Sequence, residues 1–234
     1  MQRIFTEPDP VPTPDPSVEG FSVCDVLDQR AFAMRKRRKR TRTRAALLAA
    51  AARELERVGY DALTVEGISE AAGVTRGTFY LYYKSRSAIM SVILRFYWVL
   101  LAKYRPRGGA DLPLSQTIER SNTYLVQVIA RNTQLLLARE ILMTESPGLA
   151  RRLDQVNDQW AGQVVRALVL RGLITDLAAD PVYHHLRART VIGMSDVLLR
   201  DIYRSAGLNG ARQVVDTDLI IRVLNDLWRR FMAA

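Results

Sequence analysis

The hydrophobic residues of this chain recur at helical spacing from Thr43 almost to the C-terminus. The first segment, RAALLAAAARELERVGY, predicts a helix that ends near Gly59, because glycine often follows a helix directly. Its apolar positions, which follow helical spacing, are Leu47, Leu48, Ala51, Leu55 and Val58.

Three residues with short polar side chains mark the starts of the next helices. Thr64, Thr75 and Ser85 each precede an apolar pattern, and hydroxyl side chains at such positions accept hydrogen bonds from the first free N–H groups of a helix. They predict short helices over 65–72 and 76–83 and a longer helix over 86–104. The PRGG stretch at 106–109 then gives a boundary.

Five more helices are predicted beyond this boundary, over 112–130, 132–145, 147–172, 180–205 and 215–232. No segment has the alternation typical of paired strands. The sequence therefore predicts an all-α fold of about nine helices.

The N-terminal residues differ from the rest, because proline alternates with other residues from Pro8 to Pro16. Proline fixes its own φ and restricts the residue before it, so residues 1–34 are expected to form a disordered or weakly ordered tail. Within it, residues 21–34 are a candidate short helix. Its apolar face would hold Phe21, Val26, Leu27 and Phe32.

Positive charge is concentrated in one part of the chain. The net charge is +10, and residues 35–104 hold fifteen Lys and Arg against five Asp and Glu. The run RKRRKRTRTR, residues 35–44, has eight basic residues in ten. Such a run is either a solvated charged segment or an arm that binds a polyanion. The arm consists of Arg35, Lys36, Arg37, Arg38, Lys39 and Arg40.

The residues around Gly73 fit a helix-turn-helix, in which a short turn joins two helices and the second enters the major groove of DNA. Gly73 suits a positive φ, Val74 can point into the core, and Thr75 can cap the second helix. A plain helical hairpin would need the same glycine turn. The adjacent basic segment favours the DNA-binding interpretation.

The segment LTVEGISEAAGVTRGTFYLYYKSRSAIM, residues 63–90, strongly resembles the DNA-binding segment of TetR/AcrR-type transcriptional repressors, and the close resemblance extends from Thr43 to about Met90. It departs from the usual pattern at Ser69, Tyr83 and Arg86. The residues in register are Thr64, Val65, Ile68, Ala72, Gly73, Val74, Thr75, Gly77, Thr78, Phe79, Tyr80, Tyr82, Ser85 and Ile89.

The resemblance implies a DNA-binding domain over 35–90 and a ligand-binding and dimerisation domain over 91–234. It implies a homodimer on a palindromic double-stranded operator, with Arg76, Gly77 and Thr78 nearest the bases. Phe79 and Tyr83 are expected in the core. The full set of expected DNA contacts outside the arm is Arg42, Arg44, Thr64, Thr75, Arg76, Gly77, Thr78, Tyr80, Tyr82, Lys84 and Arg86.

In this family the C-terminal helices usually enclose a pocket for a small-molecule effector. Aromatic and sulfur-containing side chains there indicate an apolar or aromatic effector, although each residue alone fits ordinary core. Effector binding would release the operator or, alternatively, promote activation. Arg139 and Glu140 are either polar pocket groups or, as favoured, a surface pair. The candidate pocket residues are Trp98, Tyr124, Met143, Trp160 and Met194.

The last two helices present apolar stripes that suit either a dimer interface or burial within one protomer. The stripes are Leu186, Val191, Met194, Leu198 and Ile202, followed by Leu219, Ile220, Val223, Leu227, Trp228 and Phe231.

Other classes of function lack support in the sequence. No catalytic constellation or glycine-rich phosphate loop is found, and His184 and His185 face different directions on a helix, so no enzyme, cofactor or metal site is expected. The single cysteine, Cys24, excludes an intrachain disulfide and fits the cytoplasm. No run of about 18 apolar residues predicts a membrane span. Binding to an anionic membrane surface through the basic run beside Ala45–Ala52 remains an alternative.

Overall fold

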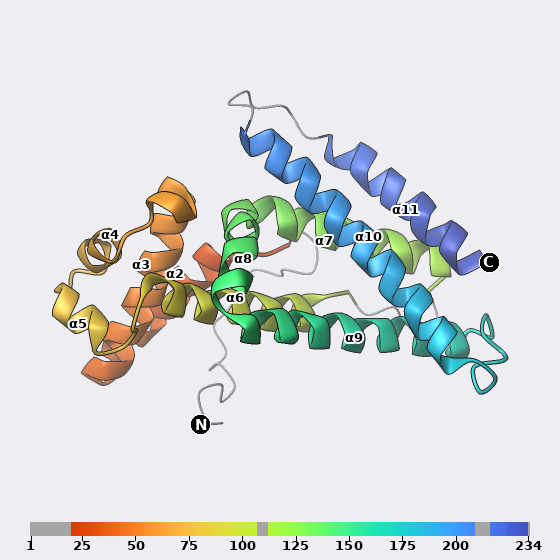
Figure 1. The fold of residues 1–234 in the computed structure, drawn as a ribbon, viewed down its shortest axis with the longest axis horizontal. Helices are drawn as coiled ribbons and strands as arrows, with labels where there is room; N and C mark the ends of the chain where they lie inside the picture. Colours follow the sequence, from red (N-terminus) through yellow and green to blue (C-terminus); the bar gives the residue numbers. More distant parts are fainter. Residues whose placement is uncertain (1–19, 107–111, 209–215, 234) are drawn as a thin grey trace.

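The computed structural model describes residues 20–106, 112–208 and 216–233, which form ten α-helices, a short 3₁₀-helix and no strand (Figure 1). The prediction of an all-α fold is confirmed. Helices α3 to α5 lie at one end of the molecule, and helices α7 to α11 form most of the rest.

Helices α3 (Lys39–Ala62), α4 (Val65–Ala71) and α5 (Arg76–Tyr80) form the small N-terminal domain, which we call the head. The predicted caps are confirmed: the hydroxyl oxygens of Thr64 and Thr75 accept hydrogen bonds from the N–H groups of Gly67 at 3.0 Å and Thr78 at 3.2 Å. The core of the head consists of the buried side chains Leu47, Leu55, Leu63, Ile68, Phe79 and Ile89.

Helix α6 (Arg86–Tyr104) begins at the cap Ser85 and joins the head to the C-terminal domain. It is long and apolar enough to cross a membrane, yet half of its most apolar stretch is buried inside the protein, as expected of a core helix. Its buried side chains include Ile89, Met90, Ile93, Leu94, Phe96, Tyr97, Trp98 and Leu100.

The N-terminal segment requires a correction. Residues 20–34 are not a weakly ordered tail: the candidate helix over 21–34 is confirmed as helix α2 (Val23–Ala33), and Met34–Lys36 form the 3₁₀-helix η1. Phe21 and Leu27 are buried as predicted, whereas Phe32 is 65% exposed. The Arg35 guanidinium covers the Phe32 ring instead. The proline-rich residues 1–19 lie outside the described part of the chain.

The buried side chain of Asn132, between α7 and α8, fixes the start of this segment. Its amide oxygen accepts from the N–H of Val23 at 2.8 Å, and its amide nitrogen donates to the carbonyl of Phe21 at 2.7 Å. Gly20, with φ of 72°, lies so close to Val128 that a Cβ would approach the Val128 nitrogen to 3.0 Å. Since α2 also packs along α3, it links the head to the C-terminal domain.

The C-terminal domain consists of five helices, which match the predicted ranges within a few residues. Helices α10 and α11 lie side by side along one edge of the molecule (Figure 1). The five helices are α7 (Leu114–Arg131), α8 (Thr133–Glu145), α9 (Pro147–Leu170), α10 (Pro181–Leu208) and α11 (Thr217–Ala233).

Candidate nucleic-acid interface

The turn between α4 and α5 has the geometry of a helix-turn-helix. Gly73 has φ of 65°, a value that favours glycine even though no neighbouring atom would meet a Cβ there. The N–H of Val74 then donates to the carbonyl of Ser69 at 2.9 Å, and the Val74 side chain packs against the core. The turn therefore fixes the direction in which α5 leaves α4.

The aromatic residues of α5 and of the turn that follows it are divided into an inner and an outer group. Phe79 is completely buried and Tyr83 is 6% exposed, whereas Tyr80 is 49% exposed. Tyr82 is intermediate. The predicted division between core and surface therefore matches the observed burial of Phe79, Tyr83 and Tyr80.

The outer face of α5 presents polar groups at its N-terminal end. Thr75, Arg76 and Gly77 are exposed, and Thr78 is partly exposed. A Cβ on Gly77 would meet only the Thr75 hydroxyl, at 3.8 Å, so the backbone here is accessible to a large ligand. The N-terminal end of a helix also favours negatively charged ligands.

Arg76 is oriented by two neighbours. Its guanidinium lies 2.6 Å from the carboxylate of Glu66 on α4, and both side chains are exposed. A side-chain hydrogen bond with Tyr80 and the charge of Glu66 raise the pKa of Arg76. A ligand that binds this guanidinium must therefore break its ion pair with Glu66. Breaking an exposed ion pair costs little free energy in water.

The basic segment is part of the folded head rather than a free arm. Arg35 and Lys36 lie in η1, Arg37 and Arg38 form an extended link, and α3 starts at Lys39. The side chains of residues 35–40 and of Arg42 are all exposed. Because this link is held between α2 and α3, its charges have a defined position beside the head.

Arg44 connects the basic segment to the end of α5. It is partly buried beside the Tyr83 hydroxyl, where its charge opposes the rise that burial causes in the pKa of Tyr83. The first turns of α3 and the residues after α5 therefore form one surface. Thr64 and Lys84 are exposed on the same head.

Arg86 does not join this surface, in contrast to the expectation from the family pattern. Its Nη1 donates to the carbonyls of Leu63 at 2.8 Å, Tyr60 at 3.0 Å and Asp61 at 3.3 Å. Its guanidinium also lies 4.6 Å from the centre of the Tyr60 ring. These bonds hold the segment after the turn at Gly59 against the start of α6, so Arg86 has a structural role, although the Tyr60 carbonyl also accepts from the N–H of Leu63 at 3.2 Å.

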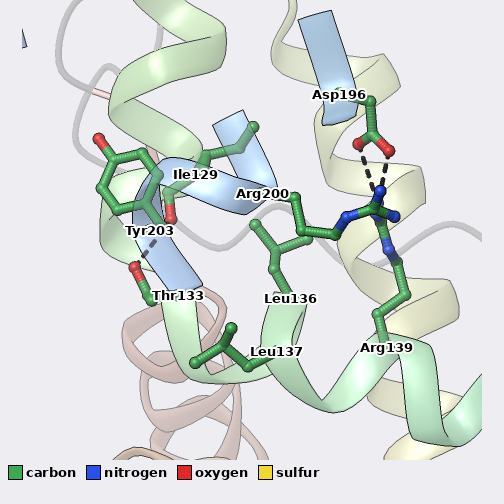
Figure 2. Close-up of a pocket in the computed structure, with 8 residues that line it drawn as sticks. All are labelled: Ile129, Thr133, Leu136, Leu137, Arg139, Asp196, Arg200 and Tyr203. Carbon is green, nitrogen blue, oxygen red and sulfur yellow. Dashed lines mark hydrogen bonds and ion pairs between the residues drawn. The ribbon is translucent and has the colours of Figure 1, made fainter. Parts of the chain in front are cut away.

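The C-terminal domain contains a small pocket between α7, α8 and α10 (Figure 2). Arg139 is buried, which differs from the surface pair favoured above, and its guanidinium binds both carboxylate oxygens of Asp196 at 2.9 and 3.0 Å. Glu140 accepts from Arg200 at 2.9 Å and, at 3.5 Å, from Arg139. The pocket is lined by Ile129, Thr133, Leu136, Leu137, Arg139, Asp196, Arg200 and Tyr203.

None of the five predicted pocket residues lines this pocket. Trp98 and Tyr124 are buried in the core, and Met143 and Trp160 are partly buried. Met194 requires a correction, because it is 50% exposed on α10. Helical spacing identified the apolar positions of these helices but not the direction in which each faces.

The exposed apolar residues of α10 and α11 form a surface of their own. The predicted stripe divides: Val191, Ile220 and Trp228 are buried within the chain, whereas Leu186 and Met194 are at least half exposed. The exposed group, which we call the α10/α11 face, consists of Val182, Tyr183, Leu186, Met194, Val197, Leu219 and Val223.

The histidines and the cysteine have ordinary surroundings. The imidazoles of His184 and His185 lie 3.1 Å from Asp176 and 3.4 Å from Asp158. Within the described residues, no group of three or more metal-binding side chains occurs. Burial raises the pKa of Cys24 to about 11, so its thiol is protonated at neutral pH.

Comparison with known proteins supports the interpretation of the head. Residues 47–93 match the family described as bacterial regulatory proteins, tetR family. The head is a TetR-family DNA-binding domain. No curated protein matches the chain significantly.

The whole chain has the fold of TetR-family transcriptional regulators. A transcriptional regulator from Rhodococcus sp. RHA1 aligns with a TM-score of 0.60 at 16% identity, covering 81% of this chain and 95% of that one. A TetR-family regulator from Mesorhizobium loti gives 0.58 at 16% identity and 84% and 98% coverage. The fatty acid degradation regulator FadR from Bacillus halodurans gives 0.55 at 15% identity and 79% and 93% coverage.

The different positions of Arg86 and Lys84 lead to a prediction for this TetR-family head. Arg86→Ala should lower the free energy of unfolding by about 1–3 kcal/mol, because the partly buried carbonyls of Tyr60 and Leu63 lose the charged donor that binds them. Lys84→Ala should leave stability within about 0.5 kcal/mol of wild type and weaken DNA binding. Urea denaturation followed by circular dichroism measures the first effect. Equal stability of the two variants would contradict the structural role of Arg86.

Proposed function

We propose that this chain is a transcriptional regulator that binds a palindromic DNA operator as a homodimer and is released by a small-molecule effector. One observation supports this proposal above all: α5 presents Arg76, Gly77 and Thr78 on a surface that continues into the folded basic segment. A polar recognition helix beside fixed cations is the arrangement that DNA binding requires.

Base recognition would come from the N-terminal end of α5. Arg76 can donate two hydrogen bonds to the O6 and N7 atoms of guanine once it leaves Glu66. Gly77, without a side chain, lets the backbone approach the base edges. Thr78 would reach the next base, although its hydroxyl also contacts the Thr75 hydroxyl at 3.0 Å.

Phosphate contacts would come from the residues around α5. Thr64, Thr75, Tyr80, Tyr82 and Lys84 border the recognition helix and would set its register on the duplex. Arg42, Arg44 and the basic segment 35–40 would extend the contact along the backbone or into the minor groove. Because the segment is folded, it would bind with a smaller loss of conformational entropy than a free arm.

A dimer would match the symmetry of the operator. The α10/α11 face exposes apolar side chains that a second copy can cover, and a two-fold axis would place the two heads in successive major grooves. Helix α6 joins each head to this domain, so a shift of α6 on effector binding would change the separation of the heads. Such a regulator would act on DNA in the cytoplasm.

Neutralising the basic segment should reduce the salt dependence of DNA binding. We expect the triple variant Arg37→Gln, Arg38→Gln, Lys39→Gln to lower the log–log slope of affinity against salt by about 0.9 for each phosphate that the protein no longer neutralises. Its sequence preference should remain. Fluorescence anisotropy on a site selected from random DNA measures the slope between low and moderate salt.

The matched control is Arg151→Gln, Arg152→Gln, Arg166→Gln, which removes three exposed charges from α9. This control should bind with the wild-type slope. If both triple variants change the slope equally, the effect is one of net charge and the basic segment has no specific role.

Charges on the α10/α11 face should dissociate the dimer. Leu186→Glu with Val223→Glu should give a monomer in size-exclusion chromatography with light scattering, because two carboxylates would be buried at the interface. Leu170→Glu on α9, where the side chain is 84% exposed, is the control and should leave the dimer intact. A dimer that persists in the double variant would show that another surface forms the interface.

A further inference from the structure

The apolar core of the C-terminal domain is divided into two parts by polar side chains. On α7, Ile118 belongs to one part and Tyr124 to the other, and the buried Asn122 lies between them. Two other long helices have a comparable buried polar residue at the same boundary, Ser195 on α10 and Asn225 on α11. On α9 the residue at this boundary is Trp160, an aromatic residue with a polar N–H.

Most groups of this polar layer have partners within the chain. The amide of Asn122 donates to Asn225 at 2.8 Å, and the indole of Trp228 donates to the Ser195 hydroxyl at 3.2 Å. The Trp160 side chain packs against both parts of the core. Its indole N–H is buried, however, and has no acceptor among the described residues.

Arg105, at the end of α6, adds a positive charge to this layer. Its guanidinium carbon lies 3.8 Å from the centre of the Trp160 ring. Burial lowers the pKa of Arg105, and in the described part of the chain no carboxylate pairs with it. A partly buried guanidinium without a counter-ion is costly, because it has given up part of its hydration.

Capping of α6 does not explain the position of Arg105. The carbonyl of Leu101, in the last turn of α6, accepts from the Tyr124 hydroxyl at 3.4 Å. Over the described residues no hydrogen bond from Arg105 to a carbonyl of that turn is found. The guanidinium instead lies on the Trp160 ring.

Two donors without acceptors, placed beside an aromatic ring and between two apolar cores, complement an anion with an apolar body. We propose that Arg105 and Trp160 bind an amphipathic carboxylate, with the carboxylate on the guanidinium and the indole N–H and its apolar part in the divided core. The inference rests on the proposed function, because this carboxylate would be the effector.

Arg105 lies at the end of the helix that connects the C-terminal domain to the head, so a ligand bound to it could affect the head. Helix α6 has 19 residues and starts directly after the recognition helix, so it spans roughly 28 Å between the two sites. A carboxylate that draws Arg105 toward itself would displace one end of a rigid helix whose other end supports the head. The ligand would thereby favour one position of the two heads over another.

Isothermal titration with 2-naphthoate and decanoate, each compared with its primary amide, tests the site on the full-length protein. At least one carboxylate should bind wild type at least tenfold more tightly than its amide. Arg105→Gln should lose at least tenfold of that affinity, and Arg105→Lys should retain the preference for carboxylate. Arg166→Gln, on the exposed side of α9, should bind as wild type.

Stability separates a ligand site from a structural role. In the absence of ligand, Arg105→Gln should unfold at the same or a higher temperature than wild type, because an unpaired charge is removed. Trp160→Phe keeps the aromatic ring, removes the indole donor, and should weaken carboxylate binding severalfold. The proposal is overturned if neither carboxylate binds wild type, if amides bind as well, or if Arg105→Gln binds unchanged.

Operator binding by the ligand-free protein, measured in the same samples, distinguishes the two proposals. If the ligand-free wild-type protein does not bind DNA, the proposed function is contradicted, whereas the carboxylate site is not. Carboxylate binding that leaves operator affinity unchanged would overturn the role of this ligand as effector.

Discussion

The burial of Phe79 is the contact on which the proposed DNA interface depends. Helix α5 spans only five residues, Arg76–Tyr80, far fewer than the roughly 12–15 that an isolated helix needs in water. Its position therefore comes from tertiary packing, in which the completely buried Phe79 ring holds it against the core of the head. Gly73 sets the entry angle, and Thr75 supplies the cap. Because Phe79 is fixed in the core, Arg76, Gly77 and Tyr80 are directed toward solvent.

Tertiary packing also connects the head to the C-terminal domain. Helix α6 buries Ile89 in the head and Tyr97 in the C-terminal domain, so one rigid element belongs to both cores. Helix α2 adds a second connection through Asn132 and through Phe21, whose ring lies 5.8 Å from that of Tyr97. Two connections of this kind restrict how the head can move relative to the effector domain. They also fix the basic segment, which lies between α2 and α3.

Local sequence signals predicted the head well, because its caps and turn depend on neighbouring residues. Thr64, Thr75 and Ser85 bond to N–H groups three residues ahead, and the inward and outward residues of α5 follow helical spacing. Features that depend on distant partners were harder to predict. The inward position of Arg86 requires the carbonyls of residues 60–63, and residues 21–34 were only a candidate helix because Asn132, which fixes its start, lies more than a hundred residues away. No local pattern reveals such contacts.

The C-terminal domain shows the same limit more strongly. The apolar spacing predicted its helices but could not show that Met194 faces outward, that Arg139 is buried on Asp196, or that polar residues on three helices divide the core. These features arise from how the helices are rotated about their axes against one another. They are also the features in which this chain can differ from other proteins with the same fold.

The most direct test of the account is the sequence preference of the recognition helix. Selection of binding sites from random DNA by wild type and by Arg76→Ala, at one salt concentration, measures this preference. We predict that wild type enriches a palindrome with one invariant guanine in each half-site and that Arg76→Ala loses the preference at that position while keeping the half-site spacing. Identical selected sequences from the two proteins, or no enriched sequence from wild type, would contradict the assignment of α5 as the element that recognises bases.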